Sequence, residues 1–239
     1  MKNKHIGWVF LYPLVLIRTL ALKFKNRKLA TEDGYIIHQK EFFGAPIVDK
    51  INYSGDKFYK FRKKIAKYAF NGEGKKALDI ATGYGFQAKA LKDVGFKEVI
   101  ALDIVPERIK RCEKLYGKEG IAFKVGDATN IFYPDNYFDV VTVSVALHDM
   151  PNKVKRKAIS EMSRVSKNLV IIFEPRTFSN PLVAWLYGTF GGLLDESLNF
   201  KEYVKDDLDK ILRDNKLKII KNENVWHNLL NIKVCKIYG

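Results

Sequence analysis

The sequence predicts an α/β fold with a mostly parallel sheet and helices on both faces. From about residue 70 onward, short apolar runs suited to buried strands alternate with stretches of helical spacing. A glycine-rich turn follows the first of these runs, and aspartates stand at the ends of the first two. Because ligands of open α/β sheets bind outside the carboxyl ends of the strands, the same pattern predicts where a ligand lies.

The expected elements follow one another in a regular order. In the first half of this region, we expect a helix at residues 86–94 and strands at 77–81, 98–102, 121–125 and 138–147. In the second half, we expect helices at 153–166 and 206–215 and strands at 168–173, 217–221 and 229–238. The 239 residues suffice for one such domain with additions but fall short of two comfortable domains.

The stretch KKALDIATGYGFQ, residues 75–87, is typical of a turn that binds a nucleotide-like ligand. Gly83 and Gly85 tolerate unusual φ values and leave no Cβ between the backbone and the ligand. Asp103 stands 20 residues after Gly83, the spacing at which an acid after the second strand reaches ribose hydroxyls. A tight turn without a ligand is the alternative, and the agreement of strand, helix and Asp103 weighs against it.

Two cofactors suit this turn. Gly83, Gly85 and Ala88 match the G-x-G-x-x-A pattern of dinucleotide sites. Asp79 disfavours NAD, because its carboxylate would face a pyrophosphate of like charge. The same carboxylate suits the ammonium and sulfonium groups of S-adenosyl-L-methionine, which we therefore expect as the cofactor.

The motif D-I-A-T-G-Y-G, residues 79–85, resembles the first motif of class I S-adenosylmethionine-dependent methyltransferases. Three later segments resemble further motifs of that family in the same order, namely EVIALDIVPERI (98–109), GDA (126–128) and FDVVTVSVAL (138–147). The resemblance covers the chain from about residue 70 to its end. It implies a Rossmann-like fold with a seven-stranded sheet that contains one antiparallel strand, here with an added N-terminal helical extension.

The resemblance also implies which residues bind the cofactor. Asp103 would bind the ribose, and Ile104 would flank the adenine. Asp127 would reach the adenine amino group, while the amide of Ala128 would meet a ring nitrogen. The other expected cofactor-binding residues belong to the first motif or end the fourth strand: Asp79, Ala81, Thr82, Gly83, Gly85 and Ser144.

The residues after the fourth strand, SVALHDMP (144–151), differ from the Asn/Asp-Pro-Pro-aromatic pattern of methyltransferases that act on nucleic-acid amino groups. They are similar to the L-H-x-x-P stretch of small-molecule and lipid methyltransferases, including ubiquinone and menaquinone C-methyltransferases and phosphatidylethanolamine N-methyltransferases. His148 is the first catalytic candidate, as a base, and a loop histidine bonded to the backbone is the alternative. Asp149, the second candidate, either orients His148 or begins the next helix. Glu174 could contact the acceptor, but a solvated carboxylate at a strand end is the favoured interpretation.

Metal and thiol chemistry find no support in the sequence. The four histidines, at positions 5, 38, 148 and 227, and the two cysteines, Cys112 and Cys235, show no ligand spacing, so no metal site is expected. Two unclustered cysteines indicate a reduced compartment rather than a disulfide scaffold.

Residues 1–69 are expected to extend a methyltransferase domain at 70–239. The first 70 residues hold 15 Lys and Arg against five Asp and Glu, so most of the formal net charge of +15 lies there. Within them, residues 6–17, IGWVFLYPLVLI, are uncharged and apolar, with basic residues on both sides. This run is shorter than a bilayer span and contains Pro13, which disfavours a transmembrane helix. Two interpretations stay open: a helix in the interface of an anionic membrane, or a helix packed on the domain over the active site.

A second apolar segment, residues 181–194, contains three aromatic residues and follows the fifth strand, where class I methyltransferases commonly place part of the acceptor pocket. The resemblance thus implies methyl transfer to an apolar small molecule or lipid-like acceptor. We expect a cytoplasmic protein, or one peripheral on the inner face of the membrane, and the sequence indicates no oligomeric state. RNA methylation through the basic surface is the second hypothesis, and a membrane-associated protein that binds the cofactor without turnover is the third.

Overall fold

The computed structural model describes residues 6–31, 34–37, 59–70, 76–195 and 197–238. The N-terminal part contains α1 (Ile6–Asn26), the short 3-10 helix η1 (Arg27–Leu29) and α4 (Tyr59–Ala69). There follow β1 (Lys76–Ile80), α5 (Phe86–Asp93), β2 (Glu98–Asp103), α6 (Pro106–Tyr116), η2 (Gly117–Glu119), β3 (Ile121–Val125) and β4 (Phe138–Ser144). The second half contains η3 (Leu147–Asp149), α7 (Asn152–Val165), β5 (Ser166–Pro175), α8 (Pro181–Leu194), α9 (Phe200–Tyr203), α10 (Leu208–Asp214), β6 (Leu217–Val225) and β7 (Leu230–Ile237).

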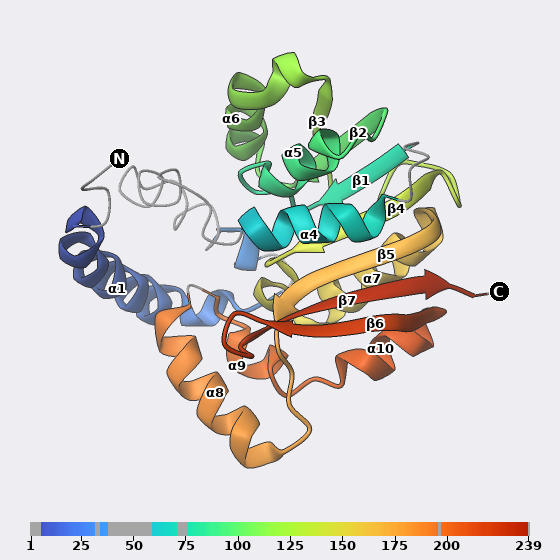
Figure 1. Ribbon diagram of the computed structural model, residues 1–239. Coiled ribbons are helices and arrows are strands. Elements are labelled where there is room, and N and C mark those ends of the chain that lie inside the picture. Colours follow the sequence, from blue (N-terminus) through green and yellow to red (C-terminus); the bar gives the residue numbers. More distant parts are fainter. Residues whose placement is uncertain (1–5, 32–33, 38–58, 71–75, 196, 239) are drawn as a thin grey trace.

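Seven strands form one twisted sheet in the order β3-β2-β1-β4-β5-β7-β6 (Figure 1). The strands β1 to β5 pair in parallel, and β7 runs antiparallel to both β5 and β6. The predicted Rossmann-like architecture with one antiparallel strand is therefore confirmed. In such a sheet the carboxyl ends of β1, β2, β4 and β5 share one edge, so the loops that follow these strands converge there.

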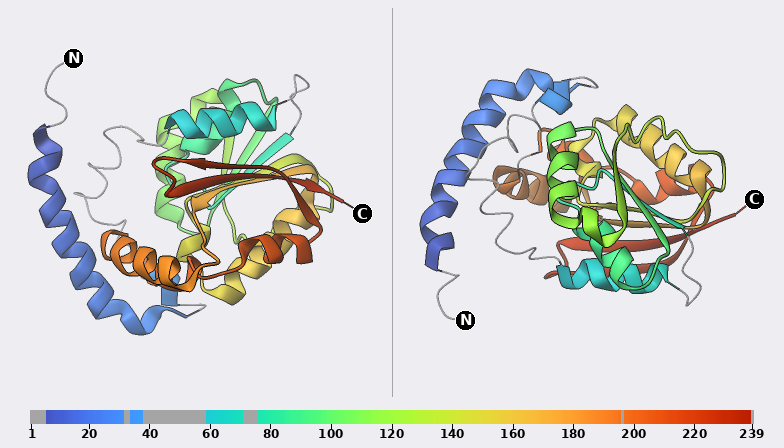
Figure 2. Two further views of the ribbon diagram at one scale, coloured as in Figure 1. Left: turned by 60° about the horizontal axis from the view of Figure 1, so that its bottom comes forward. Right: turned by 90° about the horizontal axis from the view of Figure 1, so that it is seen from above.

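Helices cover both faces of the sheet, as predicted (Figures 1 and 2). On one face, Ile65 of α4, Leu91 of α5 and Ile109 of α6 belong to one buried apolar cluster. On the other face, Ile159 of α7 and Leu212 of α10 belong to a second cluster. The helix α4 precedes residue 70 and still packs on α5, so the layer that covers this face begins before the predicted domain boundary.

The fourth strand is shorter than predicted. It ends at Ser144 rather than at residue 147, because Val145 takes a positive φ of 55° that breaks the extended backbone. The amide of Val145 still donates to the carbonyl of Phe173, and Leu147 is fully buried in the η3 turn. The apolar run continues past the strand because these turn residues are also buried, so hydropathy alone overestimates the length of the strand.

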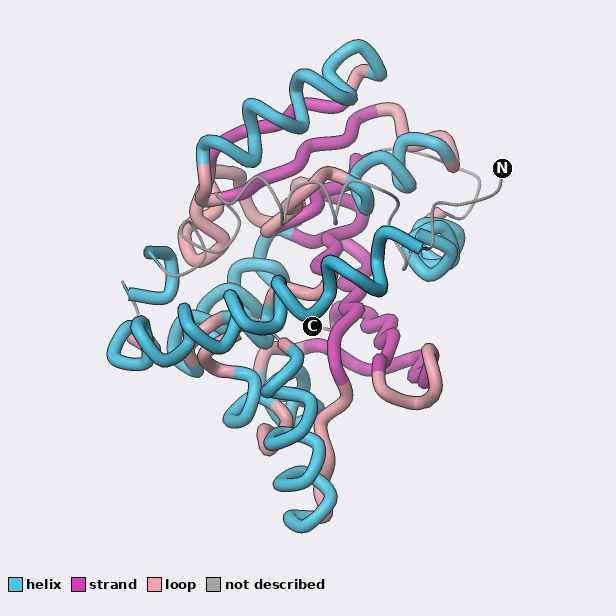
Figure 3. The backbone as a smooth tube through the Cα atoms, turned by 90° about the vertical axis from the view of Figure 1, so that its left-hand side faces the viewer, coloured by secondary structure: helices cyan, strands magenta, loops and turns pink. Residues whose placement is uncertain are grey.

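The helices α1 and α8 lie next to each other beside the sheet domain, with α1 in front in the view of Figure 3. The Lys23 ammonium of α1 donates to the carbonyls of Gly192 and Asp195, at 2.6 and 2.9 Å, at the C-terminal end of α8. A cation is favourable there, because the last carbonyls of a helix carry partial negative charge. Among the described helices, none combines the length and hydropathy that crossing a bilayer requires.

Candidate active site

The first motif forms a tight turn around the buried carboxylate of Asp79. The hydroxyl of Thr82 donates to Asp79 Oδ2 at 2.6 Å, and the hydroxyl of Thr142 on β4 donates to Oδ1 at 2.8 Å. Burial raises the pKa of Asp79 to about 6, despite these two hydrogen bonds. Both carboxylate oxygens are thus engaged by the protein, and Asp79 ties the turn after β1 to the neighbouring strand.

Asp103, at the end of β2, holds the glycine turn in place. Its Oδ2 accepts a hydrogen bond from the Gly83 amide and its Oδ1 accepts one from the Val105 amide, both at 2.9 Å. The Arg108 guanidinium of α6 lies 3.5 Å from Asp103 Oδ2. Gly85 begins α5 with a φ of 76°, and a Cβ there would come within 3.1 Å of the Cys112 sulfur. Glycine is therefore required at 85 both by its conformation and by packing.

A cavity opens at this edge of the sheet, between the loops that follow β1, β2, β3 and β4. Six of the predicted site residues line it: Ala81, Asp103, Ile104, Asp127, Ala128 and Asp149. The other lining residues are not among the predicted ones, and they include Tyr35, Arg108 and Met150. Tyr35 comes from the N-terminal extension, and nothing in its local sequence marks it as a site residue. Arg108 could have been noticed, since it follows the strand-end acid by slightly more than one helical turn.

Tyr35 places the N-terminal extension over this cavity. Its side chain is buried, and burial together with the carboxylates of Asp127, Asp149 and Asp103 raises the pKa of its hydroxyl to about 12. The cavity that remains beneath it has a volume of about 50 Å³.

The remaining predicted residues lie beside the cavity or behind it. Asp127 is exposed, and its Oδ1 accepts a hydrogen bond from the Thr129 amide at 2.7 Å. Ser144 is not among the lining residues, and its hydroxyl lies 3.3 Å from the Gln87 side-chain oxygen on α5. Asp79, Thr82, Gly83 and Gly85 shape the turn from behind. Their roles in cofactor binding stay predictions.

His148 lies in a cluster of carboxylates directly beside the cavity. Its Nδ1 is 2.7 Å from Glu174 Oε2, and its Nε2 is 3.5 Å from Asp149 Oδ1 and 3.6 Å from Asp195 Oδ2. Glu174 is only 1% exposed, so its interpretation as a solvated strand-end carboxylate is wrong. Its Oε1 accepts hydrogen bonds from the amides of Ala146 and Leu147, which fixes the turn after β4.

The carboxylates and the imidazole of this cluster shift one another's pKa values. Burial alone lowers the pKa of His148, but Asp149, Asp195 and Glu174 together raise it well above its ordinary value. Burial raises the pKa of Asp149 to about 6, while His148 opposes that change. Asp149 does not begin the next helix, because α7 starts at Asn152 with Pro151 as its N-cap residue. Of the two roles foreseen for Asp149, its position matches the contact with His148.

The two cysteines are far from nucleophilic. Both are free and buried, and burial raises the pKa of each thiol to about 12. The Cys112 thiol lies behind the glycine turn, 3.3 Å from the Gly83 carbonyl. A thiol held in its protonated form is a poor nucleophile, which agrees with the sequence-based expectation.

Comparison with known proteins finds similarity to methyltransferases. A family model described as a methyltransferase domain matches residues 78–173. A ubiquinone/menaquinone biosynthesis C-methyltransferase of Bdellovibrio bacteriovorus is 30% identical over 158 residues, which are 61% of this chain and 66% of that protein. A demethylmenaquinone methyltransferase of Paenarthrobacter aurescens is 37% identical over 112 residues, which are 46% of this chain and 41% of that protein. The chain thus spans less than two thirds of the length of these relatives.

A solved structure extends the comparison to the fold. A SAM-dependent methyltransferase from Aquifex aeolicus aligns with a TM-score of 0.61 and 20% sequence identity, over 80% of this chain and 98% of that one. Residues 78–173 thus match a methyltransferase domain, and the chain shares the fold of that solved methyltransferase. The solved structure is of a SAM-dependent enzyme, and S-adenosylmethionine is also the donor that the sequence motifs imply.

The residues of the methyltransferase domain fit that donor. Among the described atoms, nothing lies within 4 Å of the point where a Cβ at Gly83 would stand, so the backbone is open to a ligand there. The cavity beneath Tyr35 is called the donor cavity from here on. Asp103, Asp127 and Asp149 give it a negative lining, which suits a ligand that carries a sulfonium and an ammonium group. Arg108 offsets part of this charge beside Asp103.

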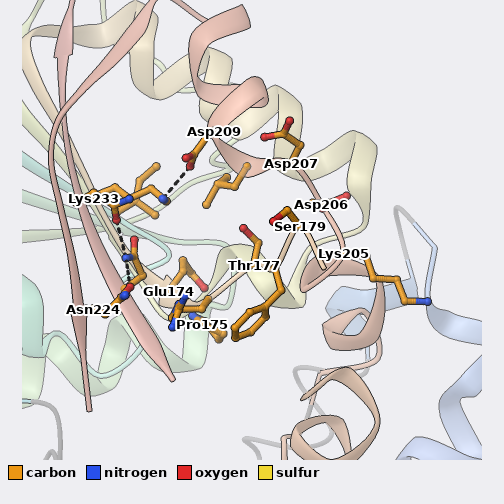
Figure 4. Close-up of a pocket in the computed structure, with 16 residues that line it drawn as sticks. Glu174, Pro175, Thr177, Ser179, Lys205, Asp206, Asp207, Asp209, Asn224 and Lys233 are labelled. Atoms are coloured by element: carbon orange, nitrogen blue, oxygen red, sulfur yellow. Dashed lines mark hydrogen bonds and ion pairs between the residues drawn. The ribbon is translucent and has the colours of Figure 1, made fainter. Parts of the chain in front are cut away.

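A second cavity of the methyltransferase domain is more polar and lies around the end of β5, α10 and the β6–β7 hairpin (Figure 4). Its volume is about 500 Å³. The Lys233 ammonium lies 2.7 Å from Asp209 Oδ1, and the Asn231 amide donates to the side-chain oxygens of Asn222 and Asn224. Because these polar groups pair with one another, the second cavity does not suit the apolar acceptor that the sequence predicts.

Proposed function

We propose that the protein transfers the methyl group of S-adenosylmethionine to an apolar, quinone-like small molecule at the surface of a membrane. The observation that carries this proposal is the position of Asp149. It lines the donor cavity, and it lies in the same cluster around His148 as Asp195, which directly follows α8. The donor cavity and the apolar helix α8 therefore flank the same side chains.

Methyl transfer is a displacement at the carbon that the sulfonium of the bound donor activates, so the protein mainly aligns the acceptor and excludes water. Asp149 faces the donor cavity, whereas His148 is almost fully buried behind it. We therefore assign Asp149 the contact with the acceptor and the removal of its proton. His148, held by Glu174, positions Asp149. This reverses the order of the two catalytic candidates that the sequence suggests.

The outer face of α8 supports an apolar partner. Glycines at 188 and 191 let the inner face pack closely on α9, where an added Cβ would come within 2.9 and 3.0 Å of Val204 and Phe200. The outer face exposes six large apolar side chains: Leu182, Val183, Trp185, Leu186, Phe190 and Leu193. An exposed apolar face of this kind is typical of an interaction site.

The neighbouring α1 adds both apolar and basic groups. Ile17, Leu20 and Phe24 are exposed on α1, and Lys25, Arg27 and Lys28 follow at its end and in η1. Apolar and aromatic side chains next to cations suit the headgroup region of an anionic membrane, where each nearby Lys or Arg contributes about 1 kcal/mol. A lipid-soluble acceptor would reach the enzyme from such a surface.

The names of the two relatives favour a quinone-like acceptor, since one is a ubiquinone/menaquinone biosynthesis C-methyltransferase and the other a demethylmenaquinone methyltransferase. RNA methylation remains the second candidate, favoured by the sequence pI near 9.6. Donor binding without turnover is the third.

Labelling of a cell extract tests the proposal directly. The full chain is incubated with extract and radiolabelled S-adenosylmethionine, and the products are separated into lipid, RNA, protein and small-molecule fractions. We expect label in the lipid fraction, with an Asp149→Asn variant losing at least 100-fold in rate. Label confined to RNA would establish the second candidate instead, and an unlabelled extract with intact donor binding would establish the third.

Sedimentation with anionic vesicles tests the membrane part separately. The full chain should sediment with the vesicles, and replacing Trp185 and Phe190 together by Ser should reduce the bound fraction several-fold. Phe132→Ser is the matched control, because Phe132 is 99% exposed but lies in the loop between β3 and β4. Equal sedimentation of all three proteins would contradict docking through α8.

A further inference from the structure

We propose that His148, Asp149 and Asp195 form a binding site for one divalent transition-metal cation, next to the donor cavity. The ligand atoms are His148 Nε2, one oxygen of Asp149 and one oxygen of Asp195, and all three lie within 4.8 Å of one another. His148 and Asp149 are neighbours in η3, and Asp195 joins them because the end of α8 converges with η3 beyond β4 and β5. The proposal departs from the sequence-based expectation of no metal site.

The distances allow an ion with movements of two side chains. The Nε2 atom of His148 is 3.5 Å from Asp149 Oδ1 and 3.6 Å from Asp195 Oδ2. Ligands at about 2.0–2.2 Å from a metal lie roughly 3.0–3.5 Å from one another in tetrahedral or octahedral arrangements. Both distances from His148 Nε2 are thus close to this range, whereas the two carboxylate oxygens, which lie within 4.8 Å of each other, need to approach by up to about 1.8 Å.

The histidine is oriented in the way that metal-binding histidines usually are. Its other ring nitrogen, Nδ1, lies 2.7 Å from Glu174 Oε2, and Glu174 is fixed by the amides of Ala146 and Leu147. A carboxylate on the far side of an imidazole sets the ring orientation and strengthens the metal-binding nitrogen. Glu174 thus directs Nε2 toward the two aspartates.

The backbone around the cluster is also held in place. The Ser197 hydroxyl donates to the His148 carbonyl, and the Asn199 side-chain amide donates to the Asp149 carbonyl, both at 2.8 Å. The Ser197 amide donates to Asp195 Oδ1, which leaves Oδ2 directed at the imidazole. Such support is what keeps a metal site at its productive geometry.

The cluster also carries an unsatisfied acceptor and an excess of negative charge. Asp149 Oδ1 is buried and accepts no hydrogen bond from the described residues. Three carboxylates, those of Asp149, Glu174 and Asp195, surround a single imidazole. A buried charge of one sign is costly unless an opposite charge or a metal compensates it. A divalent cation would supply that compensation, with the Nε2 proton released to solvent when the ion binds.

The donor set narrows the choice of ion. One imidazole nitrogen and two carboxylate oxygens suit Mn²⁺, Fe²⁺, Co²⁺ or Zn²⁺. They suit Ca²⁺ and Cu⁺ less well, because Ca²⁺ prefers oxygen ligands alone and Cu⁺ prefers sulfur ligands. Three protein ligands leave coordination positions open on the side of the donor cavity, which Asp149 lines. If the proposed methyltransferase function holds, an oxygen of the acceptor would occupy one of these positions.

Direct metal titration tests the proposal without any turnover. The full chain is stripped with a chelator and titrated with Mn²⁺, and bound ion is measured by the loss of the free Mn²⁺ signal in electron paramagnetic resonance. We expect one ion per chain, with an affinity that falls 10- to 100-fold in Asp195→Asn. Asn at 195 keeps an oxygen that can accept from the Ser197 amide, so the loop should stay folded.

Asp214→Asn is the matched control, because Asp214 is an exposed aspartate of α10 whose partner is Lys210. Its Mn²⁺ affinity should equal that of the parent chain. A parent chain that binds no Mn²⁺ or Zn²⁺ at micromolar concentration, or an Asp195→Asn variant with unchanged affinity, would overturn the proposal. S-adenosylmethionine binding is measured on the same samples, so that failure of the metal site and failure of the proposed function are told apart.

Discussion

The donor half of the site, which is the turn after β1 together with Asp103, comes mostly from one stretch of the chain, whereas the acceptor half, which is the cluster around His148, joins three separate segments. Asp103 accepts from the amides of Gly83 and Val105 across two adjacent strands. The cluster around His148 instead requires Glu174 from β5 and Asp195 from the end of α8. One strand–turn–helix–strand unit supplies the glycine turn and Asp103, to which Thr142 of β4 adds a contact with Asp79, while the acceptor half requires β5 and the end of α8.

The two halves also differ in their exposure to solvent. The donor turn packs on buried strands, while α8 and α1 present apolar side chains outward. The residues of the glycine turn are thus separate from those on the outer face of α8, and Asp149 connects the two regions. Substitutions in the donor half and in the acceptor half should therefore have different effects.

The largest loss of stability is expected on substitution of Glu174, whose hydrogen bonds connect the residues of the acceptor half. Glu174→Ala leaves two buried amides and the His148 ring without their acceptor, so we expect a loss of about 3–5 kcal/mol in the free energy of unfolding. Glu174→Gln keeps one oxygen and should lose less. Urea denaturation measures both values, and a loss below about 1 kcal/mol in Glu174→Ala would contradict this structural role.

A pH effect should arise in the donor half from Asp79. Its pKa is about 6 in the folded chain against 3.8 ordinarily, so the folded state takes up a proton at a higher pH than the unfolded state. Asp79 therefore contributes at most about 3 kcal/mol to the free energy of unfolding below about pH 4. This contribution is lost as the pH rises through 6. Asp79→Asn should remove that part of the pH dependence in urea unfolding between pH 4 and 7. Identical slopes in the two proteins would refute the assignment.

The two glycines of the donor turn should respond differently. Gly85→Ala adds a Cβ at a positive φ and close to Cys112, so we expect a loss of about 2 kcal/mol in stability. Gly83→Ala has the same conformational strain but open space around the Cβ, so its stability loss should be about 1 kcal/mol. Its main effect should be weaker donor binding, measured by calorimetry. Equal stability losses in the two variants would show that packing at 85 contributes little.

The smallest stability effect is expected on the outer face of α8. Phe190 is 63% exposed, so Phe190→Ser should change the free energy of unfolding by about 0.5 kcal/mol or less. Donor affinity should also stay unchanged, because α8 contributes no residue to the donor cavity. A loss above about 2 kcal/mol would mean that α8 packs more tightly than its exposure indicates.

The donor half could be predicted from the sequence because its signals are local. The spacing from Gly83 to Asp103 and the apolar runs around them fix the strands, the turn and the order of the elements. The end of β4 was placed too late, because buried turn residues such as Leu147 look like a continuing strand. The contact between His148 and Asp195 has no local signal, since 47 positions separate the two residues. Tyr35 was missed for the same reason.

The central claim is that the edge of the sheet around Gly83 and Asp103 binds S-adenosylmethionine. Calorimetric titration of the full chain with this donor tests it most directly, alongside Asp103→Asn and the surface control Asp214→Asn. We predict one donor per chain, a loss of at least 100-fold in affinity in Asp103→Asn, and no change in the control. Absence of donor binding to a folded parent chain, or equal affinity in Asp103→Asn, would contradict the account.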